Sequence, residues 1–145
     1  MSRFTLRLVT LVALVGAVVL AGASIAIANT ASGSQNSDFT VTATLASSGP
    51  DSERATAGDN VTASASLTNN TASVQKADVS AVIVGPDGAV MYQKSRSVTL
   101  PRGKTSSASY DLPVLSGYLP GIYTLTVSAA NANGASSASA TIELY

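Results

Sequence analysis

Apolar and polar residues alternate along most of the chain after residue 38, with the period of two that is typical of β-strands. Over residues 39–45 the alternation places Phe39, Val41, Ala43 and Leu45 on one face and threonines on the other. Such a strand buries one face and leaves the other in water. The same pattern recurs over residues 61–67, 77–84, 106–112, 122–129 and 135–144.

Gly, Pro, Asn and Asp separate these runs, as expected where a chain reverses direction. The tetrapeptide GPDG over residues 85–88 predicts a hairpin between the run over 77–84 and a strand over 89–93. Residues 97–100 either continue that strand or follow it as another. About seven short strands with this punctuation favour an all-β fold, a seven-stranded antiparallel immunoglobulin-like sandwich over residues 39–145.

The inward positions of the expected strands are mostly Ala, Val and Leu, and aromatic residues are scarce. Alanine buries little area, so the predicted core contributes modest hydrophobic stabilisation. The alanine-rich tract over residues 129–140 is also predicted to be strand, because Gly134, its neighbouring asparagines and repeated serines oppose a helix.

The N-terminal region has a different pattern, a long run without charge. Residues 8–28 read LVTLVALVGAVVLAGASIAIA, and Arg3 and Arg7 precede them. A basic start, an apolar run and the small-x-small site Ala26–Ala28 are features of a signal peptide cleaved after Ala28. Alternatively, a helix over this uncharged run reaches about 30 Å, enough to span a bilayer as a membrane anchor.

Both interpretations predict one N-terminal hydrophobic helix and place the following chain outside the cytoplasm, because the positive residues precede it. Residues 29–38 are small and polar, which indicates a flexible spacer. We therefore expect a signal peptide or membrane anchor over residues 1–28, the spacer over 29–38 and the folded domain over 39–145. The domain is then secreted, or held at the membrane by residues 8–28.

Composition removes several classes of function. The chain has no Cys, His or Trp, which excludes the usual zinc, haem and iron–sulfur sites and Cys/His or Ser/His catalysis. Apart from Arg3 and Arg7, six Lys and Arg stand against eight Asp and Glu, a net charge of 6 − 8 = −2. This balance predicts no nucleic-acid partner. We expect no catalytic residue, no cofactor and no metal site.

Two groups of charged residues could suggest a metal site or a crosslink, and both groups are better explained as solvated residues. Asp51, Glu53 and Asp59 lie close in sequence, but their spacing matches no calcium loop, so a solvated loop is expected. Lys76, Lys94 and Lys104 raise the idea of an isopeptide crosslink to Asn or Asp. The chemistry needs a buried lysine, whereas these lysines stand at turns or beside polar residues, so we expect them in solvent.

Two asparagines fit the acceptor pattern for N-glycosylation. Asn60 and Asn69 are each followed by Thr at the second position, in NVT and NNT. Both asparagines are therefore candidate acceptors.

A family resemblance follows from four segments: Ala57–Thr62, Leu67–Asn69, Val98–Gly103 and Pro120–Val127. A Gly-Asp turn leading into a strand that ends in Thr-Asn, together with a late Pro-Gly-x-Tyr strand, resembles the bacterial cell-adhesion-related domain called CARDB. The likeness covers roughly residues 39–145 in a single copy. It implies an immunoglobulin-like fold and an extracellular interaction role, and it implies no catalytic residue.

The tyrosine in the last segment also has a physical interpretation of its own. Tyr123 stands shortly after Gly121, at the start of a late strand. A tyrosine there can bury its ring and donate its hydroxyl hydrogen to a nearby carbonyl, the arrangement called a tyrosine corner. We expect this structural role for Tyr123.

These observations favour an exported, non-catalytic interaction or adhesion module whose partner is an extracellular protein or carbohydrate. The alternative is a structural subunit of an extracellular polymer, in which a strand edge pairs with a neighbouring copy. An enzyme is disfavoured because no catalytic constellation is present.

Export with cleavage predicts that the exported protein begins at Asn29. N-terminal sequencing or intact mass of the exported protein measures this directly, because removal of residues 1–28 changes the mass by a known amount. An exported protein with its N-terminus intact, found in the membrane fraction, would instead identify residues 8–28 as an anchor.

Overall fold

The computed structural model describes residues 37–145, and these residues form eight β-strands and no helix. No segment in that range is a helix able to cross a membrane. The hydrophobic helix expected over residues 8–28 lies outside the described residues, as does the expected spacer except for Ser37 and Asp38. The strands are β1 (Phe39–Ser47), β2 (Arg54–Ala55), β3 (Asn60–Asn69), β4 (Gln75–Val84), β5 (Val90–Leu100), β6 (Thr105–Pro113), β7 (Gly121–Asn131) and β8 (Gly134–Leu144).

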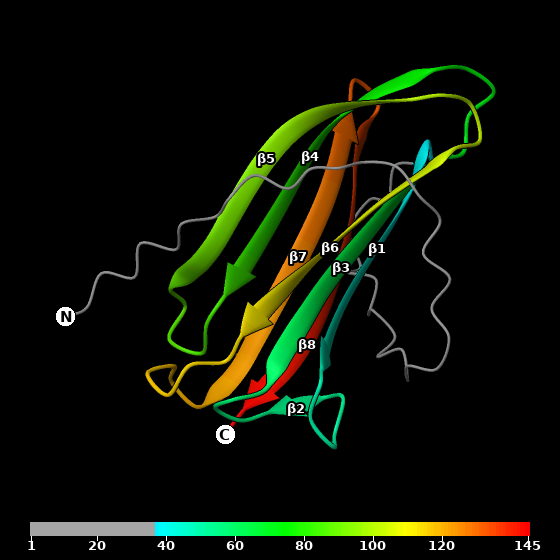
Figure 1. Ribbon diagram of the computed structural model, residues 1–145. Helices are drawn as coiled ribbons and strands as arrows, with labels where there is room; N and C mark the ends of the chain where they lie inside the picture. Colours follow the sequence, from blue (N-terminus) through cyan, green and yellow to red (C-terminus); the bar gives the residue numbers. More distant parts are fainter. Residues whose placement is uncertain (1–36) are drawn as a thin grey trace.

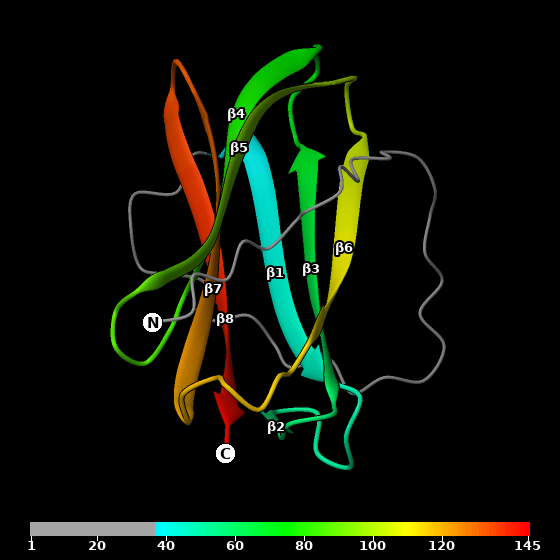
Figure 2. The same cartoon turned by 60° about the vertical axis from the view of Figure 1, so that its left-hand side comes forward.

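The strands form two sheets that face each other (Figures 1 and 2). The smaller sheet has the order β1-β3-β6, and the larger has the order β2-β8-β7-β4-β5. All neighbouring strands are antiparallel except β2, which pairs in parallel with β8. The chain therefore alternates between the layers, and strands distant in sequence become neighbours.

The expected all-β fold is confirmed, with one correction to the strand count. The structure has eight strands rather than seven, because the turn-rich stretch after β1 contains the two-residue strand β2. A strand this short shows no alternation in the sequence. Of the two alternatives for residues 97–100, the structure shows continuation, because residues 90–93 and 97–100 belong to one long strand, β5. The hairpin over residues 85–88 is present, with the Gly85 N–H donating to the Ala89 carbonyl at 2.9 Å.

The core forms where the inner faces of the two sheets meet. Every inward residue expected on β7 is buried, namely Tyr123, Leu125, Val127 and Ala129. On β1 the residues Phe39, Ala43 and Leu45 are buried, whereas Val41 is half-buried. The alternation therefore identified the core faces correctly. The alanine-rich tract is strand, as expected, and lies in β7 and β8.

The two sheets have unequal widths, and this leaves one side of the molecule open. β1 packs against β8 and β7, and β3 reaches β7, whereas β5 makes extensive contact within residues 37–145 only with β4. In Figure 2, β6 stands apart from β5 along most of its length. Within residues 37–145, the inner face of β5 therefore has no strand opposite it before Val98, whereas Val98 and Leu100 are buried in a cluster with Phe39 and Leu67.

One buried asparagine joins the two sheets at the end where β5 turns into β6. Asn69, the last residue of β3, is fully buried. Its Nδ2 donates to the carbonyls of Ser73 (2.8 Å), Leu100 (3.0 Å) and Pro101 (3.2 Å), and its Oδ1 accepts from the Thr71 N–H at 2.9 Å. These bonds tie β3 to the end of β5, so the sheets are held together here.

The burial of Asn69 bears on one of the two candidate glycosylation acceptors. Asn69 fits the N-glycosylation pattern, yet its amide nitrogen is buried and its hydrogens are engaged by backbone carbonyls. A glycan on Nδ2 would replace one of the two hydrogens that make these bonds, and the nitrogen is buried, so Asn69 is a poor acceptor in the folded protein. The sequence pattern reports only the spacing of Asn and Thr, and burial of Asn69 is decided by the turns that close over it.

Replacing Asn69 by alanine is expected to lower the free energy of unfolding by roughly 2–4 kcal/mol, because it leaves buried carbonyls without a donor. Urea unfolding of the purified protein measures the change. The matched control is Asn70→Ala, because Asn70 is the adjacent asparagine and is exposed. Equal losses for the two variants would contradict the proposed role of Asn69.

Candidate functional site

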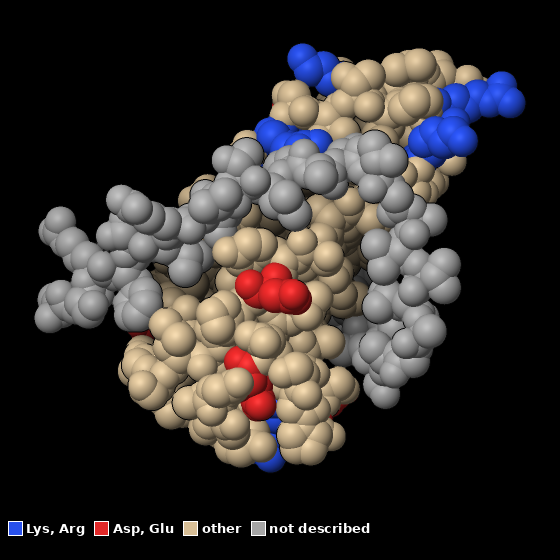
Figure 3. Space-filling model, viewed as in Figure 1, with Lys and Arg blue, Asp and Glu red and all other residues tan. Residues whose placement is uncertain are grey.

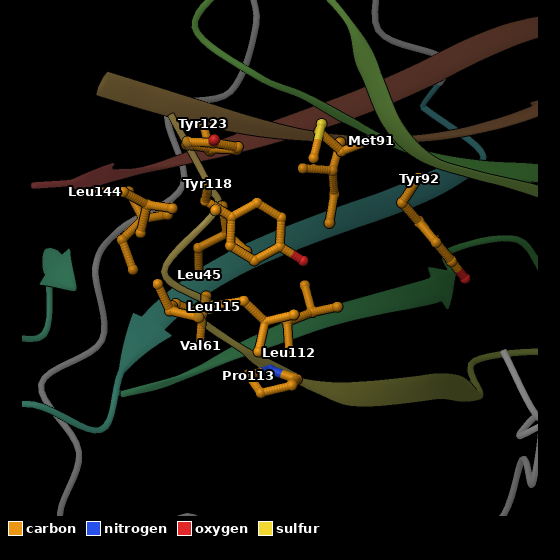
Figure 4. Close-up of a pocket in the computed structure, with 14 residues that line it drawn as sticks. Leu45, Val61, Met91, Tyr92, Leu112, Pro113, Leu115, Tyr118, Tyr123 and Leu144 are labelled. Atoms are coloured by element: carbon orange, nitrogen blue, oxygen red, sulfur yellow. The ribbon is translucent and has the colours of Figure 1, made fainter. Parts of the chain in front are cut away.

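An apolar pocket lies at the other end of the molecule, where β5 and β6 diverge. Its volume is about 290 Å³. Side chains from both sheets and from the loop between β6 and β7 enclose it (Figure 4). The pocket is lined by Leu45, Val61, Ile83, Met91, Tyr92, Leu112, Pro113, Val114, Leu115, Gly117, Tyr118, Tyr123, Ile142 and Leu144.

Tyr123 fixes the loop that forms one wall of the pocket. Its ring is buried, and its hydroxyl donates to the carbonyl of Leu119 at 2.9 Å. The expected tyrosine corner is therefore confirmed. Burial raises the pKa of Tyr123, and the nearby charge of Asp87 adds to the rise, so the hydroxyl keeps the hydrogen that it donates. The Tyr118 ring packs edge-on against Tyr123, with 6.3 Å between ring centroids.

A close backbone approach sets where this loop returns to β7. Gly121 has φ of 137°, a conformation that favours glycine. A side chain at this position would also meet Pro86, because a Cβ would lie 2.6 Å from the Pro86 Cβ. The β4–β5 turn and the β6–β7 loop are therefore packed together beside the pocket.

Two tyrosines from opposite sheets face the open side above the pocket. Tyr92 pairs with the buried Ile83, and Tyr110 pairs with Ala63, so both side chains point to the inner faces of their sheets. Nevertheless 36% of Tyr110 is exposed. Burial raises the pKa of Tyr92, and the electrostatic influence of Tyr110 raises this pKa further, so the two phenol groups interact electrostatically.

Large apolar side chains surround the mouth of the pocket and are exposed to solvent. Met91 and Leu115 line the pocket and are exposed, and the exposed Tyr110 precedes the pocket-lining Leu112 by two residues on β6. Val90 at the start of β5 and Leu119 in the β6–β7 loop are also exposed. Within residues 37–145 the opposite end exposes one such residue, Val74. Clusters of this kind mark binding surfaces more often than isolated exposed residues do.

Charge is distributed unevenly between the two ends. Most lysines and arginines of residues 37–145 gather over β4, β5 and the β5–β6 turn, away from the pocket, as Figure 3 shows for one face. Arg54 is the exception, and it pairs with Glu143 at 2.9 Å near the pocket end. The pocket end otherwise carries acidic residues in its turns, namely Asp51, Glu53, Asp59 and Asp87.

The acidic residues weighed as a calcium site serve as caps of a turn. The Asp51 carboxylate accepts from the Glu53 N–H at 3.0 Å, and the Asp59 carboxylate accepts from the N–H and the hydroxyl of Thr56. Residues 37–145 contain no group of three or more side chains placed to hold a metal ion. The structure thus gives these carboxylates a local role in shaping the loop.

The three lysines weighed for a crosslink do not share one environment. Lys76 and Lys104 are exposed, as expected. Lys94 corrects the expectation, because it lies inside β5 rather than at a turn and is half-buried. It pairs with Ala81 on the inner face, and Arg96 pairs with Val79 on the same face. Among the described residues the one ion pair is Arg54–Glu143, so neither cation has an acidic partner there.

The remaining glycosylation candidate, Asn60, is exposed at the start of β3. Sequence reasoning did not identify the pocket, because its residues come from seven strands and from a loop without alternation. The only local signal was the apolar and aromatic content of the PVLSGYLPG segment over residues 113–121, which is unusual for a solvated loop.

No family model matches the sequence, and no curated protein matches it. Solved structures share the fold. The C-terminal domain of wzt is 15% identical with a TM-score of 0.52, and the match covers 77% of this chain and 75% of that one. The Pseudomonas fluorescens alkylpurine DNA glycosylase AlkC bound to DNA is 19% identical, with a TM-score of 0.53 and coverage of 76% and 31%.

A β-glucosidase from Listeria innocua is 11% identical, with a TM-score of 0.52 and coverage of 73% of this chain and 16% of the glucosidase. The chain thus spans less than a third of either enzyme. At these identities the likeness concerns the fold alone.

Replacing Tyr123 by phenylalanine is expected to lower the free energy of unfolding by about 1 kcal/mol, because the ring stays and one hydrogen bond is lost. Hydrogen exchange should also quicken in the loop over residues 114–120, which that bond holds. Tyr145→Phe is the control, because Tyr145 is an exposed tyrosine at the same end. Unchanged exchange in the loop would contradict the assigned role.

Proposed function

We propose that this chain is an exported, non-catalytic immunoglobulin-like module that binds a partner protein or carbohydrate at the apolar pocket. The observation that carries the proposal is the pocket itself, with exposed apolar side chains at its mouth. Ligand sites are typically concave and mostly apolar, with few polar groups.

The strand order supports the immunoglobulin-like part of the proposal. Three strands face a larger sheet, and a tyrosine at the start of the penultimate strand donates to the backbone four residues earlier. Both features are typical of immunoglobulin-like sandwiches. The resemblance to CARDB adds the expectation of a role in adhesion outside the cell.

The size of the pocket limits what can enter. A volume of 290 Å³ is at the lower end of the roughly 300–1,000 Å³ of ordinary ligand sites. One aromatic side chain, or one small apolar group of a larger partner, fits such a space. The pocket is therefore suited to anchoring a larger partner.

The absence of catalysis is part of the proposal and rests on the residue types. The chain contains no His or Cys, and the pocket is lined by apolar residues and tyrosines. General acid–base or nucleophilic chemistry needs groups whose pKa lies near the working pH. We accordingly propose binding as the activity of the domain, without a cofactor.

A second candidate function is the structural subunit of an extracellular polymer, because β6 has a free edge. β6 is bonded to β3 on one side, and within residues 37–145 no strand is bonded to its other side. Free edges of this kind pair with strands of other chains.

A titration with indole tests the binding proposal. Backbone NMR shifts should saturate at residues that line the pocket, and Met91→Asp should weaken the affinity at least about fivefold, because a charge at the rim disfavours apolar burial. Met91 is 41% exposed, so this substitution spares the fold. Val74→Asp, at the other end, is the control. The absence of saturable shifts at the pocket would contradict the proposal.

A further inference from the structure

We propose that the open side between β5 and β6 binds an extended, acidic peptide strand of another protein, which pairs with the free edge of β6 and places an apolar side chain in the pocket. The inference rests on the proposed function and names its partner class. It combines four features of the open side: a missing strand, an unprotected edge, two cations without acidic partners and the pocket.

The unequal sheets provide the space for a strand. Within residues 37–145, the part of β5 before Val98 has no strand opposite it, so a strand added beside β6 would lie over the inner-face residues of that part. Neighbouring strands lie about 4.8 Å apart and facing sheets about 10 Å apart. The added strand would therefore continue the smaller sheet and cover inner-face residues that are now half-buried, such as Val79, Ala81 and Tyr92.

The ladder between β3 and β6 shows which groups of β6 are free. The Asn69 N–H donates to the Lys104 carbonyl, and the Val114 N–H donates to the Asp59 carbonyl. With the register of the two strands, these bonds assign the even-numbered residues of β6 to the ladder with β3. The N–H groups of Ser107 and Ser109 therefore point to the open edge.

The two edges of the open side differ in their protection against pairing. β5 carries Lys94 and Arg96 on its inner face, and inward-pointing charges discourage strand addition. β6 has no Lys or Arg, and its proline, Pro113, is its last residue. Small residues dominate its exposed positions. Of the two edges, β6 is the one built to accept a strand.

The cations then specify the charge of the incoming strand. Lys94 and Arg96 point into the open side, and neither is paired with an acidic residue of the described chain. Alternate residues of a strand lie roughly 7 Å apart on one face. The positions of Tyr92, Lys94 and Arg96 thus fit a strand with an apolar residue at the pocket and carboxylates two and four residues away on the same face.

A second copy of this chain fits this chemistry less well. The acidic residues at the pocket end lie in turns and are engaged locally, as Asp51 and Asp59 are, or pair across strands, as Glu143 does. None belongs to an unpaired extended segment within residues 37–145. A peptide from another protein is therefore the occupant that we infer.

The test uses two nine-residue peptides whose sequences are the reverse of each other, so that both chain directions are tried. As an extended strand, each peptide has threonines on one face and Phe, Asp and Glu at alternate positions on the other. Calorimetry with the exported protein should detect binding of one of them. Lys94→Glu combined with Arg96→Glu should weaken it at least tenfold, and a peptide with lysines in place of the acids should bind this double variant better. Failure of both peptides overturns the inference.

Backbone methylation separates strand pairing from simple charge attraction. Two versions of the bound peptide, N-methylated on alternate sets of residues, have the same charge, but only one set faces β6. One version should lose binding and the other keep it, and equal effects overturn strand addition. On the protein, Ser109→Pro should also abolish binding, because it removes a free edge N–H without breaking the ladder to β3.

The remaining outcomes separate failure of this inference from failure of the proposed function on which it rests. If indole binds the pocket and the peptides do not, the proposed function stands and strand addition is wrong. If neither binds, both fail. If sedimentation shows a dimer that Ser109→Pro converts to monomer, the added strand comes from a second copy of this chain. That result would overturn the inference that the strand belongs to another protein.

Discussion

The architecture depends on the buried amide of Asn69. Its Nδ2 donates to carbonyls at the β5–β6 turn and its Oδ1 accepts from the chain beyond β3, so one side chain holds both sheets at one end. A buried amide is stable only when its polar atoms are paired, and this requirement fixes the turns around it. Because β5 and β6 are joined here, they can separate only toward the opposite end.

That opposite end is where the molecule has unfilled surface. Five strands face three, and within residues 37–145 the inner face of β5 before Val98 has no covering strand. The Tyr123 corner keeps the β6–β7 loop in place, so the gap persists as a defined pocket rather than closing by collapse of the loop. The pocket, the free edge of β6 and the inward cations of β5 are thus consequences of one constraint, the unequal width of the sheets.

Local patterns were sufficient for the strands and for the faces that they bury. Alternation placed Phe39, Leu45 and Leu125 in the core, and the Gly-x-Tyr segment identified Tyr123, because both signals depend on neighbours in sequence. β2 could not be recognised, since two residues show no period. The site could not be predicted either, because its lining comes from seven strands and a loop.

The sequence by itself determined the all-β character, the inward positions and the uncharged segment that predicts export. The tertiary structure alone decided which polar residues are buried and where the surface stays open. Asn60 and Asn69 share one pattern, yet one is exposed and the other is fully buried. The sequence predicts that Lys94 is solvated, whereas in the structure it points toward the inner face of its sheet. The physical reason is that alternation assigns a residue to a face, whereas burial depends on what lies opposite that face.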